Sequence, residues 1–369
     1  MSEFFITEVK GSVGLITLNR PKALNALNLD MVRGLTQVLL QWKDDPQVHA
    51  VAIRGSDKTG VFGGFCAGGD IRFFHQAALS GNPALEDFFT EEYRLNHLIH
   101  SYPKPYIAFL DGIVMGGGMG ISQGSCYRMV TGKTKMAMPE THIGLFPDVG
   151  GGYFLSRCPG HSGEWLGLTG HALGAAEAIS LGLADYCLDS TRLHDAWDAL
   201  SHDSASQSDP SQWLTKFSVK PAASPELDLT RIDHFFGLPS AQAIVYALEA
   251  DSSEWAQKTA STLRHRSPMM LEVVLQQIRR ARTMTLAEDL RMERDMVRHC
   301  FYTVHLNRSS TTSETVEGIR ALAVDKDHSP RWSPQRIEDV SAEMVAPFFE
   351  SPWPAHAHPL RDLTRPTIG

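Results

Sequence analysis

The first half of the chain alternates short strand-like runs with a helix-like run, and this alternation constrains the fold more than any other feature. The strand-like runs are rich in β-branched residues and bounded by Gly or Pro: Gly14–Leu18, His49–Arg54, Pro105–Leu110 and Tyr127–Thr131. Apolar residues recur at helical spacing from Leu27 to Trp42, with Asn28 as the expected N-cap. This pattern predicts an α/β domain whose sheet is covered by helices.

The second half of the chain is predicted to be mostly helical. Spaced apolar residues with abundant Arg and Glu occur in Pro239–Trp255, Met269–Ala281 and Leu286–His305. We therefore expect an α/β core over 1–200, a polar linker or loop over 201–211, a helical region over 212–343 and an irregular tail over 344–369.

Composition excludes several classes of function. The 369 residues carry a net charge of −8, which does not favour binding to nucleic acid. The five cysteines are scattered without paired metal spacing, and no histidine pair has ligand spacing, so we expect reduced thiols and no metal site. No apolar run is long enough to span a bilayer, and the first residues lack signal or transit character, so we expect a cytoplasmic protein without membrane partners.

Two glycine-rich segments could place backbone N–H groups close to a ligand. In Phe65–Asp70 (FCAGGD), a Gly-Gly step precedes an acid at an expected strand-to-helix turn. The turn could point N–H groups at a developing oxyanion, or it could be a tight turn in which Asp70 caps a helix; both readings stay open. Met115–Gly120 (MGGGMG) has four glycines in five positions, which fits an oxyanion donor better than a nucleotide loop because no nucleotide-binding motif surrounds it.

The segment Pro139–Gly152 (PETHIGLFPDVGGG) carries two carboxylates, Glu140 and Asp148, among apolar residues. Carboxylates in a partly dry pocket have shifted pKa values that suit acid–base chemistry. The alternative is an ordinary loop whose acids cap a helix.

Together these segments resemble the crotonase (enoyl-CoA hydratase/isomerase) superfamily, and within it the branch of 3-hydroxyisobutyryl-CoA hydrolases. The resemblance extends from RPKALNAL (Arg20–Leu27) and EEYRLN (Glu91–Asn96) to VEGIRALAVDKDHSPRWSP (Val316–Pro334), about nine-tenths of the chain. It implies an α/β fold built as a crotonase-like spiral of repeated ββα units with a mostly helical C-terminal region. It also implies a small-molecule acyl-CoA substrate, no cofactor apart from the CoA of that substrate, and valine degradation as the pathway. Relatives often form homo-oligomers, and the oligomeric state is left open.

The resemblance also implies residue roles. The oxyanion donors would be the N–H groups of Gly69 and Gly117, the catalytic acids Glu140 and Asp148, and an acyl contact Glu92. The residues expected to contact CoA are Lys22, Leu24, Ala67 and Asp70.

Two departures from the family pattern carry information. Hydratases in this superfamily have a second glutamate three residues beyond the oxyanion glycine, where this chain has Gly120, and they usually have glycine in place of Asp148. This argues against hydration, which needs two acids around one water. The hydrolase branch usually has Asp-Phe where this chain has Glu314-Thr315, so the acyl or CoA pocket near this region could differ.

The resulting hypothesis is thioester hydrolysis, with Glu140 acting either as general base or as nucleophile. Hydratase or isomerase chemistry and a non-catalytic scaffold are the alternatives. Cys66 is expected to be a buried thiol, His142 a loop histidine and Arg279–Arg282 an exposed helix face. Lys326 is a candidate CoA contact by resemblance.

Overall fold

The computed structural model describes residues 4–58, 62–202, 213, 216–221 and 227–364. The chain divides into two compact units, each made of three separate stretches. We call them the sheet unit (Met1–Gly69, Arg94–Ala137 and Ala172–Leu227) and the helical unit (Asp70–Tyr93, Met138–His171 and Asp228–Gly369). This division differs from the expected one, in which residues 1–200 form a single core. Most of the expected linker, residues 203–211, lies outside the described residues.

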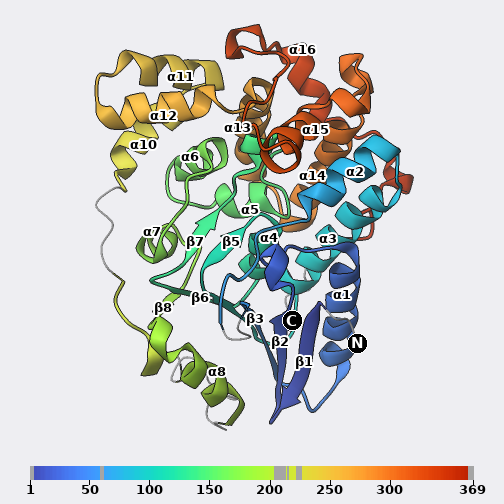
Figure 1. Cartoon of the computed structure of the whole chain (residues 1–369), viewed down its shortest axis with the longest axis vertical. Helices are drawn as coiled ribbons and strands as arrows, with labels where there is room; N and C mark the ends of the chain where they lie inside the picture. The colour runs from blue at the N-terminus through green and yellow to red at the C-terminus, as the bar shows by residue number, and fades with distance from the viewer. Residues whose placement is uncertain (1–3, 59–61, 203–212, 214–215, 222–226, 365–369) are drawn as a thin grey trace. The chain divides into compact units, whose positions relative to one another are not determined.

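The sheet unit is built on a six-stranded sheet in the order β1-β2-β3-β4-β6-β8 (Figure 1). Strand β1 is antiparallel to β2, and all other neighbours in the sheet are parallel. The strands are β1 (Phe5–Lys10), β2 (Val13–Leu18), β3 (Ala50–Gly55), β4 (Tyr106–Leu110), β6 (Tyr127–Thr131) and β8 (Tyr186–Leu188). A second, two-stranded parallel sheet joins β5 (Ile113–Met115) to β7 (Lys135–Ala137).

Helices cover both faces of the larger sheet, as the alternation predicts. On one face, α1 (Leu29–Asp44) packs the ring of Trp42 against Gly14 of β2, where an added Cβ would lie only 2.5 Å from the ring. On the other face, Trp197 of α8 (Leu193–His202) joins a core that includes Leu15 of β2 and Phe109 of β4. Successive strand residues point to opposite faces, so the two helices use alternate positions of the same strand.

The four strands and the first helix expected in the first half are confirmed within about one residue at their ends. The side chain of Asn28 caps α1 by accepting a hydrogen bond from Met31 N at 2.9 Å. Among the elements with described bounds, the sheet unit also contains the short helices α4 (Gly117–Gln123) and α7 (Ala175–Ser180) and the 3₁₀ turns η1 (Pro21–Ala23) and η3 (Ser190–Arg192). Helix α3 (Ala84–His100) begins in the helical unit and ends in the sheet unit.

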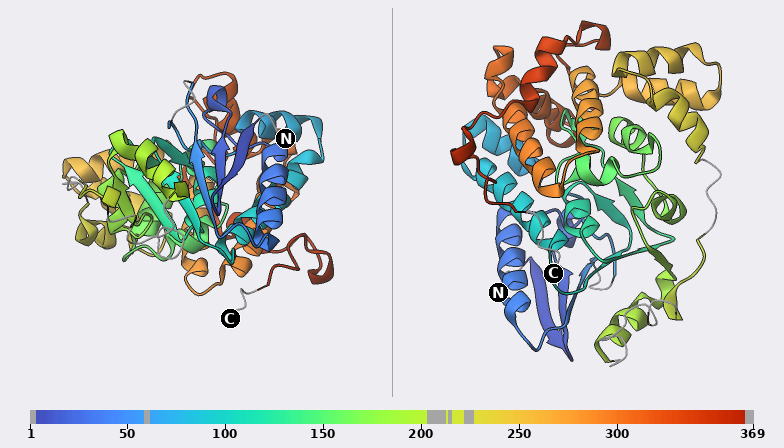
Figure 2. Two further views of the ribbon diagram at one scale, coloured as in Figure 1. Left: turned by 90° about the horizontal axis from the view of Figure 1, so that it is seen from below. Right: turned by 180° about the vertical axis from the view of Figure 1, so that it is seen from behind.

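The helical unit contains most of the C-terminal half, as expected. Its helices are α2 (Ile71–Ser80), α5 (Gly151–Leu155), α6 (Ser162–Thr169), α10 (Leu229–Phe236), α11 (Ala241–Ala250), α12 (Glu254–Arg264), α13 (Pro268–Ala281), α14 (Leu286–Phe301), α15 (Glu314–Ile319) and α16 (Ala342–Val345). Helices α11 and α12 lie side by side, drawn in gold in both views of Figure 2.

One expected helix, Pro239–Trp255, is two helices in the structure. Asp251 ends α11, and its side chain accepts a hydrogen bond from Ser253 N at 2.8 Å. Ser253 then caps α12 by accepting from Ala256 N at 3.3 Å. Asp and Ser compete for backbone groups in this way, so they break a helix that the apolar spacing alone would continue.

The tail beyond residue 344 is largely irregular, with short helical turns η8 (Ala346–Phe349) and η9 (Ala355–Ala357). Other single turns are η2 (Glu140–Ile143), η4 (Val304–Leu306), η5 (Ser310–Thr312), η6 (Arg320–Val324) and η7 (Ile337–Asp339). Among the described residues, no helix combines the length and apolar character that crossing a membrane would require.

Candidate active site

The two glycine-rich turns of the sheet unit meet each other. Cys66 N donates to Ile113 O at 3.0 Å, and Met115 N donates back to Cys66 O at 2.9 Å, so the segment leading to Gly69 pairs with the segment leading to Gly117. The contact is close: a Cβ on Gly68, whose φ is +104°, would lie 3.6 Å from Gly117 N. The structure therefore brings the two predicted oxyanion donors, Gly69 and Gly117, into one region of the sheet unit.

Small residues at these turns are required by this packing. A Cβ on Gly118, the second residue of α4, would lie 2.4 Å from Cys66 O. Gly116, which precedes the helix, has a φ of 48° and a ψ of −121°, a conformation that L side chains avoid. The first N–H groups of a helix have no acceptor within it, and those of α4 belong to Gly117 and Gly118.

Three of the residues expected to contact CoA, Lys22, Leu24 and Ala67, belong to the sheet unit, and the fourth, Asp70, belongs to the helical unit. Ala67 N donates to Leu24 O at 3.0 Å, which joins two of the four. Leu24 is 51% exposed and has a φ of 51°, and Lys22 is exposed in η1 just before it. Asp70 is half-buried and caps α2 by accepting from Phe73 N at 3.3 Å, so the capping reading of this residue is confirmed.

The two predicted acids lie on successive turns of the helical unit. Glu140 opens the 3₁₀ turn η2, which Gly144 ends with a φ of 66°. Asp148 precedes α5, and Gly151 N donates to Asp148 O at 2.8 Å. Glu140 is 7% and Asp148 6% exposed, so both carboxyl groups are buried.

A third carboxylate, Glu92 of α3, belongs to the same cluster and is 2% exposed. Burial, followed by repulsion from Asp148, raises the pKa of both Glu92 and Glu140 well above the usual range. Among the described residues, none donates a hydrogen bond to Glu92 Oε1 or Glu140 Oε2. Buried oxygens without donors are costly in a folded protein and are typical of ligand-binding sites.

Asp148 accepts a hydrogen bond from a tyrosine side chain. Tyr93 Oη donates to Asp148 Oδ2 at 2.9 Å, and the tyrosine is fully buried. Burial raises the pKa of Asp148 to about 7, and this hydrogen bond partly opposes the rise. Negative charge in the cluster is therefore more stable on Asp148 than on Glu140 or Glu92.

Residues from α13 and α14 form hydrogen bonds with the backbone of the turn that carries Asp148. The sequence did not predict this role for them. Glu293 accepts hydrogen bonds from Gly150 N at 2.7 Å and Gly152 N at 2.9 Å. Gln277 donates to Pro147 O at 2.7 Å and to Glu293 at 3.1 Å. Their partners lie 130 to 143 positions away, so no local signal marks them.

The departure at Glu314-Thr315 supports the Glu140 turn. Thr315 Oγ1 donates to Gly144 O at 2.7 Å, at the end of η2. The Glu314 side chain accepts from Ser267 Oγ and Ser333 N, and burial raises its pKa to about 7. Both residues of this pair therefore have structural partners within the helical unit.

Three other residues considered from the sequence do not join the acid cluster. The Cys66 thiol is buried, and its Sγ lies 3.7 Å from Gly68 O. Burial lowers the pKa of the half-buried His142 to about 4, which keeps it neutral. Lys326 is exposed, with a φ of 59°, on a turn of the helical unit.

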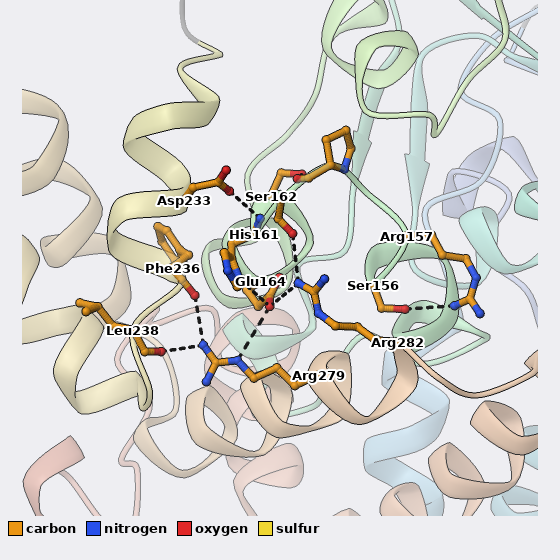
Figure 3. Close-up of polar contacts among 12 residues, drawn as sticks. Ser156, Arg157, His161, Ser162, Glu164, Asp233, Phe236, Leu238, Arg279 and Arg282 are labelled. Carbon is orange, nitrogen blue, oxygen red and sulfur yellow. Dashed lines mark hydrogen bonds and ion pairs between the residues drawn. The ribbon is translucent and has the colours of Figure 1, made fainter.

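The arginine run Arg279–Arg282 has a structural role rather than forming a free helix face (Figure 3). Arg282 donates at 2.7 Å to Glu164, a fully buried residue of α6, which also contacts His161 Nδ1 at 3.0 Å. Arg279 lies 3.8 Å from the same carboxylate and donates to the carbonyl groups of Phe236, Leu238 and Pro239. The exposed helix face that the sequence predicts is present at Arg280 and Arg282, but it is not a free face, because a buried carboxylate needs cationic partners.

Comparison with known proteins decides the family. A family model described as enoyl-CoA hydratase/isomerase matches residues 13–349. The chain belongs to the enoyl-CoA hydratase/isomerase family. It is 37% identical to the mitochondrial 3-hydroxyisobutyryl-CoA hydrolase of Gallus gallus, with 94% of this chain and 88% of the relative covered. It is 39% identical to the mitochondrial enzyme of that name from Danio rerio (93% and 88% covered) and 39% identical to the probable 3-hydroxyisobutyryl-CoA hydrolase 3 of Arabidopsis thaliana (94% and 91% covered).

Solved structures of this family share the fold. A carnitinyl-CoA dehydratase from Mycobacterium thermoresistibile matches with a TM-score of 0.85 at 36% identity, covering 95% of this chain and 97% of the other. An enoyl-CoA hydratase from Rhodobacter sphaeroides matches with a TM-score of 0.82 at 33% identity, covering 94% and 97%. The crotonase-like α/β fold predicted from the sequence is confirmed.

The comparisons also correct one expectation. The Gallus gallus and Danio rerio relatives are named as mitochondrial proteins, as are those of Xenopus tropicalis and Rattus norvegicus. A cytoplasmic location, which rested on the absence of a recognisable leader at the first residues, is therefore not supported.

Proposed function

We propose that this protein hydrolyses the thioester of 3-hydroxyisobutyryl-CoA, or of a closely related short 3-hydroxyacyl-CoA, to the free hydroxy acid and CoA. The observation that carries the proposal is the buried pair Glu140 and Asp148, in a chain whose curated relatives are named for this hydrolysis. Burial favours the uncharged form of Glu140 more strongly than that of Asp148, so Asp148 ionises more readily. Such a difference between two neighbouring carboxyl groups suits acid–base chemistry. We further propose that the reaction belongs to valine degradation, as the family resemblance implies.

The first step of the proposal polarises the thioester. The carbonyl oxygen accepts hydrogen bonds from Gly69 N–H and Gly117 N–H, which stabilise the tetrahedral intermediate. Losing one such donor costs about 10²–10³-fold in rate. Both donors belong to the backbone, so they stay in place when side chains are substituted.

Glu140 supplies the second step, by one of two routes. As a general base it takes a proton from water, and the resulting hydroxide attacks the carbonyl carbon. As a nucleophile its carboxylate attacks directly, expels the CoA thiolate and forms an anhydride that water then opens. Either route needs the ionised carboxylate, and the raised pKa of Glu140 makes that form a strong base.

Asp148 selects the substrate. We propose that it accepts a hydrogen bond from the 3-hydroxyl group, leaving Tyr93 on its other oxygen. A plain acyl-CoA would lack the hydroxyl donor for this buried carboxylate, a loss that a polar site penalises. The departing CoA thiol needs little help from an acid, since an ordinary thiol has a pKa of about 8.5.

Substrate binding needs no separate cofactor in this proposal. Leu24 and Ala67 would contact CoA through backbone atoms, and Lys22 and Asp70 would lie beside them. Glu92 would contact the acyl group.

The test is release of CoA thiol from 3-hydroxyisobutyryl-CoA and from isobutyryl-CoA, with hydration of crotonyl-CoA followed in parallel. Fast release from the hydroxylated thioester alone is the expected result. Hydration without thiol release would refute the hydrolase assignment.

The two routes for Glu140 are separated by a single turnover in ¹⁸O-labelled water. On the nucleophilic route, water that opens the anhydride at the Glu140 carbonyl carbon puts label into the Glu140 carboxylate, and an unlabelled oxygen of Glu140 leaves with the product acid; label in Glu140 therefore establishes this route. The general-base route leaves Glu140 unlabelled and puts all label into the product acid. Mass spectrometry of the peptide that contains Glu140 gives the answer.

A further inference from the structure

The carboxylate of Asp148 is held on one side by a single phenol. Tyr93 Oη lies 2.9 Å from Asp148 Oδ2, and Tyr93 is fully buried, with the ring of Phe89 at a centroid separation of 6.2 Å. A tyrosine packed in this way cannot change its rotamer freely. Its hydroxyl therefore fixes one oxygen of the carboxylate.

The backbone that carries Asp148 is strained. Val149, the next residue, has a φ of 57°, and Gly150 has a φ of 88°. A β-branched residue in the left-handed region is a true outlier, and such strain persists only where the surroundings hold it. Val149 is 3% exposed, so water does not provide that support.

The support comes from Glu293. Its two oxygens accept from Gly150 N and Gly152 N, on both sides of the point where the strained turn enters α5. Gln277 joins the Glu293 carboxylate to Pro147 O on the other side of Asp148. Glu293 and Gln277 are fully buried, so these hydrogen bonds have no competition from solvent.

We infer that Tyr93 and Glu293 are positioning residues that form a clamp on Asp148, Tyr93 on its side chain and Glu293 on its backbone. Through this clamp they determine how strongly the enzyme prefers a 3-hydroxylated acyl group over the plain one. The inference rests on the proposed function, in which Asp148 accepts the substrate hydroxyl. A displacement of about 1 Å in a binding group can cost about 100-fold, so loosening the clamp reduces the preference without removing the oxyanion donors or Glu140.

The test uses two variants of similar shape. Tyr93→Phe removes only the hydroxyl donor. Glu293→Gln keeps the side-chain volume but replaces one acceptor oxygen with an amide group. That amide, itself a donor, would face the N–H group of Gly150 or Gly152. Matched controls are Tyr106→Phe, which removes the hydroxyl of a buried tyrosine on β4, and Glu164→Gln, which neutralises another fully buried carboxylate of the helical unit.

The readout is the ratio of kcat/KM for 3-hydroxyisobutyryl-CoA to that for isobutyryl-CoA, with isobutyryl-CoA also measured as a competitive inhibitor. We expect the ratio to fall about 10-fold or more in both clamp variants. It should stay within about 3-fold of the original in both controls, even where Glu164→Gln unfolds more easily. If Glu293→Gln does not fold, the ratio measured for Tyr93→Phe alone tests the clamp.

The outcomes separate this inference from the proposed function. A loss of preference in Asp148→Asn but not in the clamp variants would overturn the clamp and leave the role of Asp148 intact. Equal losses on both thioesters in the clamp variants would make them merely structural residues and would also overturn it. An original chain without any preference for the hydroxylated thioester would refute the proposed contact, and the inference with it.

Discussion

Replacing Asp148 with asparagine should stabilise the folded protein at and above neutral pH while impairing its selectivity. Burial raises the pKa of Asp148 from its ordinary value of 3.8 to about 7. Between these values the folded state keeps a proton that the unfolded state has lost, so the stability associated with this group is present at low pH and is lost as pH rises through about 7. The difference of about 3 pH units corresponds to roughly 4 kcal/mol of cost at pH 8.

Asparagine removes that cost and keeps the acceptor for Tyr93. It also removes the repulsion that raises the pKa of Glu92 and Glu140. Urea unfolding followed by tryptophan fluorescence should therefore show Asp148→Asn more stable by roughly 4 kcal/mol near pH 8, and by only about 1–2 kcal/mol near pH 5. Asp30→Asn, at an exposed position of α1, should change stability by less than about 0.5 kcal/mol at either pH. An Asp148→Asn chain that is less stable, or whose gain does not depend on pH, would refute the electrostatic reasoning.

Three further substitutions test the rest of the site. Glu140→Gln should lower thiol release about 1,000-fold with an unchanged circular dichroism spectrum, and a variant within about 10-fold of the original would contradict its proposed role. Gly118→Ala places a Cβ 2.4 Å from Cys66 O and should cost about 1–3 kcal/mol in urea unfolding as well as activity; an unaffected variant would mean that the turn can relax. Cys66→Ser should keep more than about a third of the activity, because a buried thiol that is not the nucleophile can be replaced; complete loss would reopen the nucleophile assignment.

Features that depend on neighbouring residues could be predicted from the sequence. Asn28 and Asp70 cap the helices that follow them, because a capping side chain bonds an N–H only three positions away. Four of the parallel strands, β2, β3, β4 and β6, were recognised from their own β-branched residues. Short strands such as β8, with three residues, were not recognised because so short a run has no detectable period.

The site could be predicted only in part. Glu140 and Asp148 were found because they lie together in a distinctive segment, and family resemblance added Gly69 and Gly117. The support of the acid turns depends on hydrogen bonds such as Gly150 N to Glu293 and Thr315 to Gly144, which join positions 143 and 171 residues apart. No local pattern encodes such pairs, because either partner alone looks like an ordinary helix residue.

The order in which a ribosome makes this chain gives these long-range bonds a further consequence. The turn of Asp148 emerges well before α13 and α14, whose Gln277 and Glu293 hold it. Until those helices are synthesised, the nascent chain has no means to offset the strain at Val149 or the burial of the acids. We therefore expect the acid cluster to assemble late, after much of the sheet unit is already available to fold, so that premature termination before α14 would yield chains with glycine-rich turns but no ordered acid cluster.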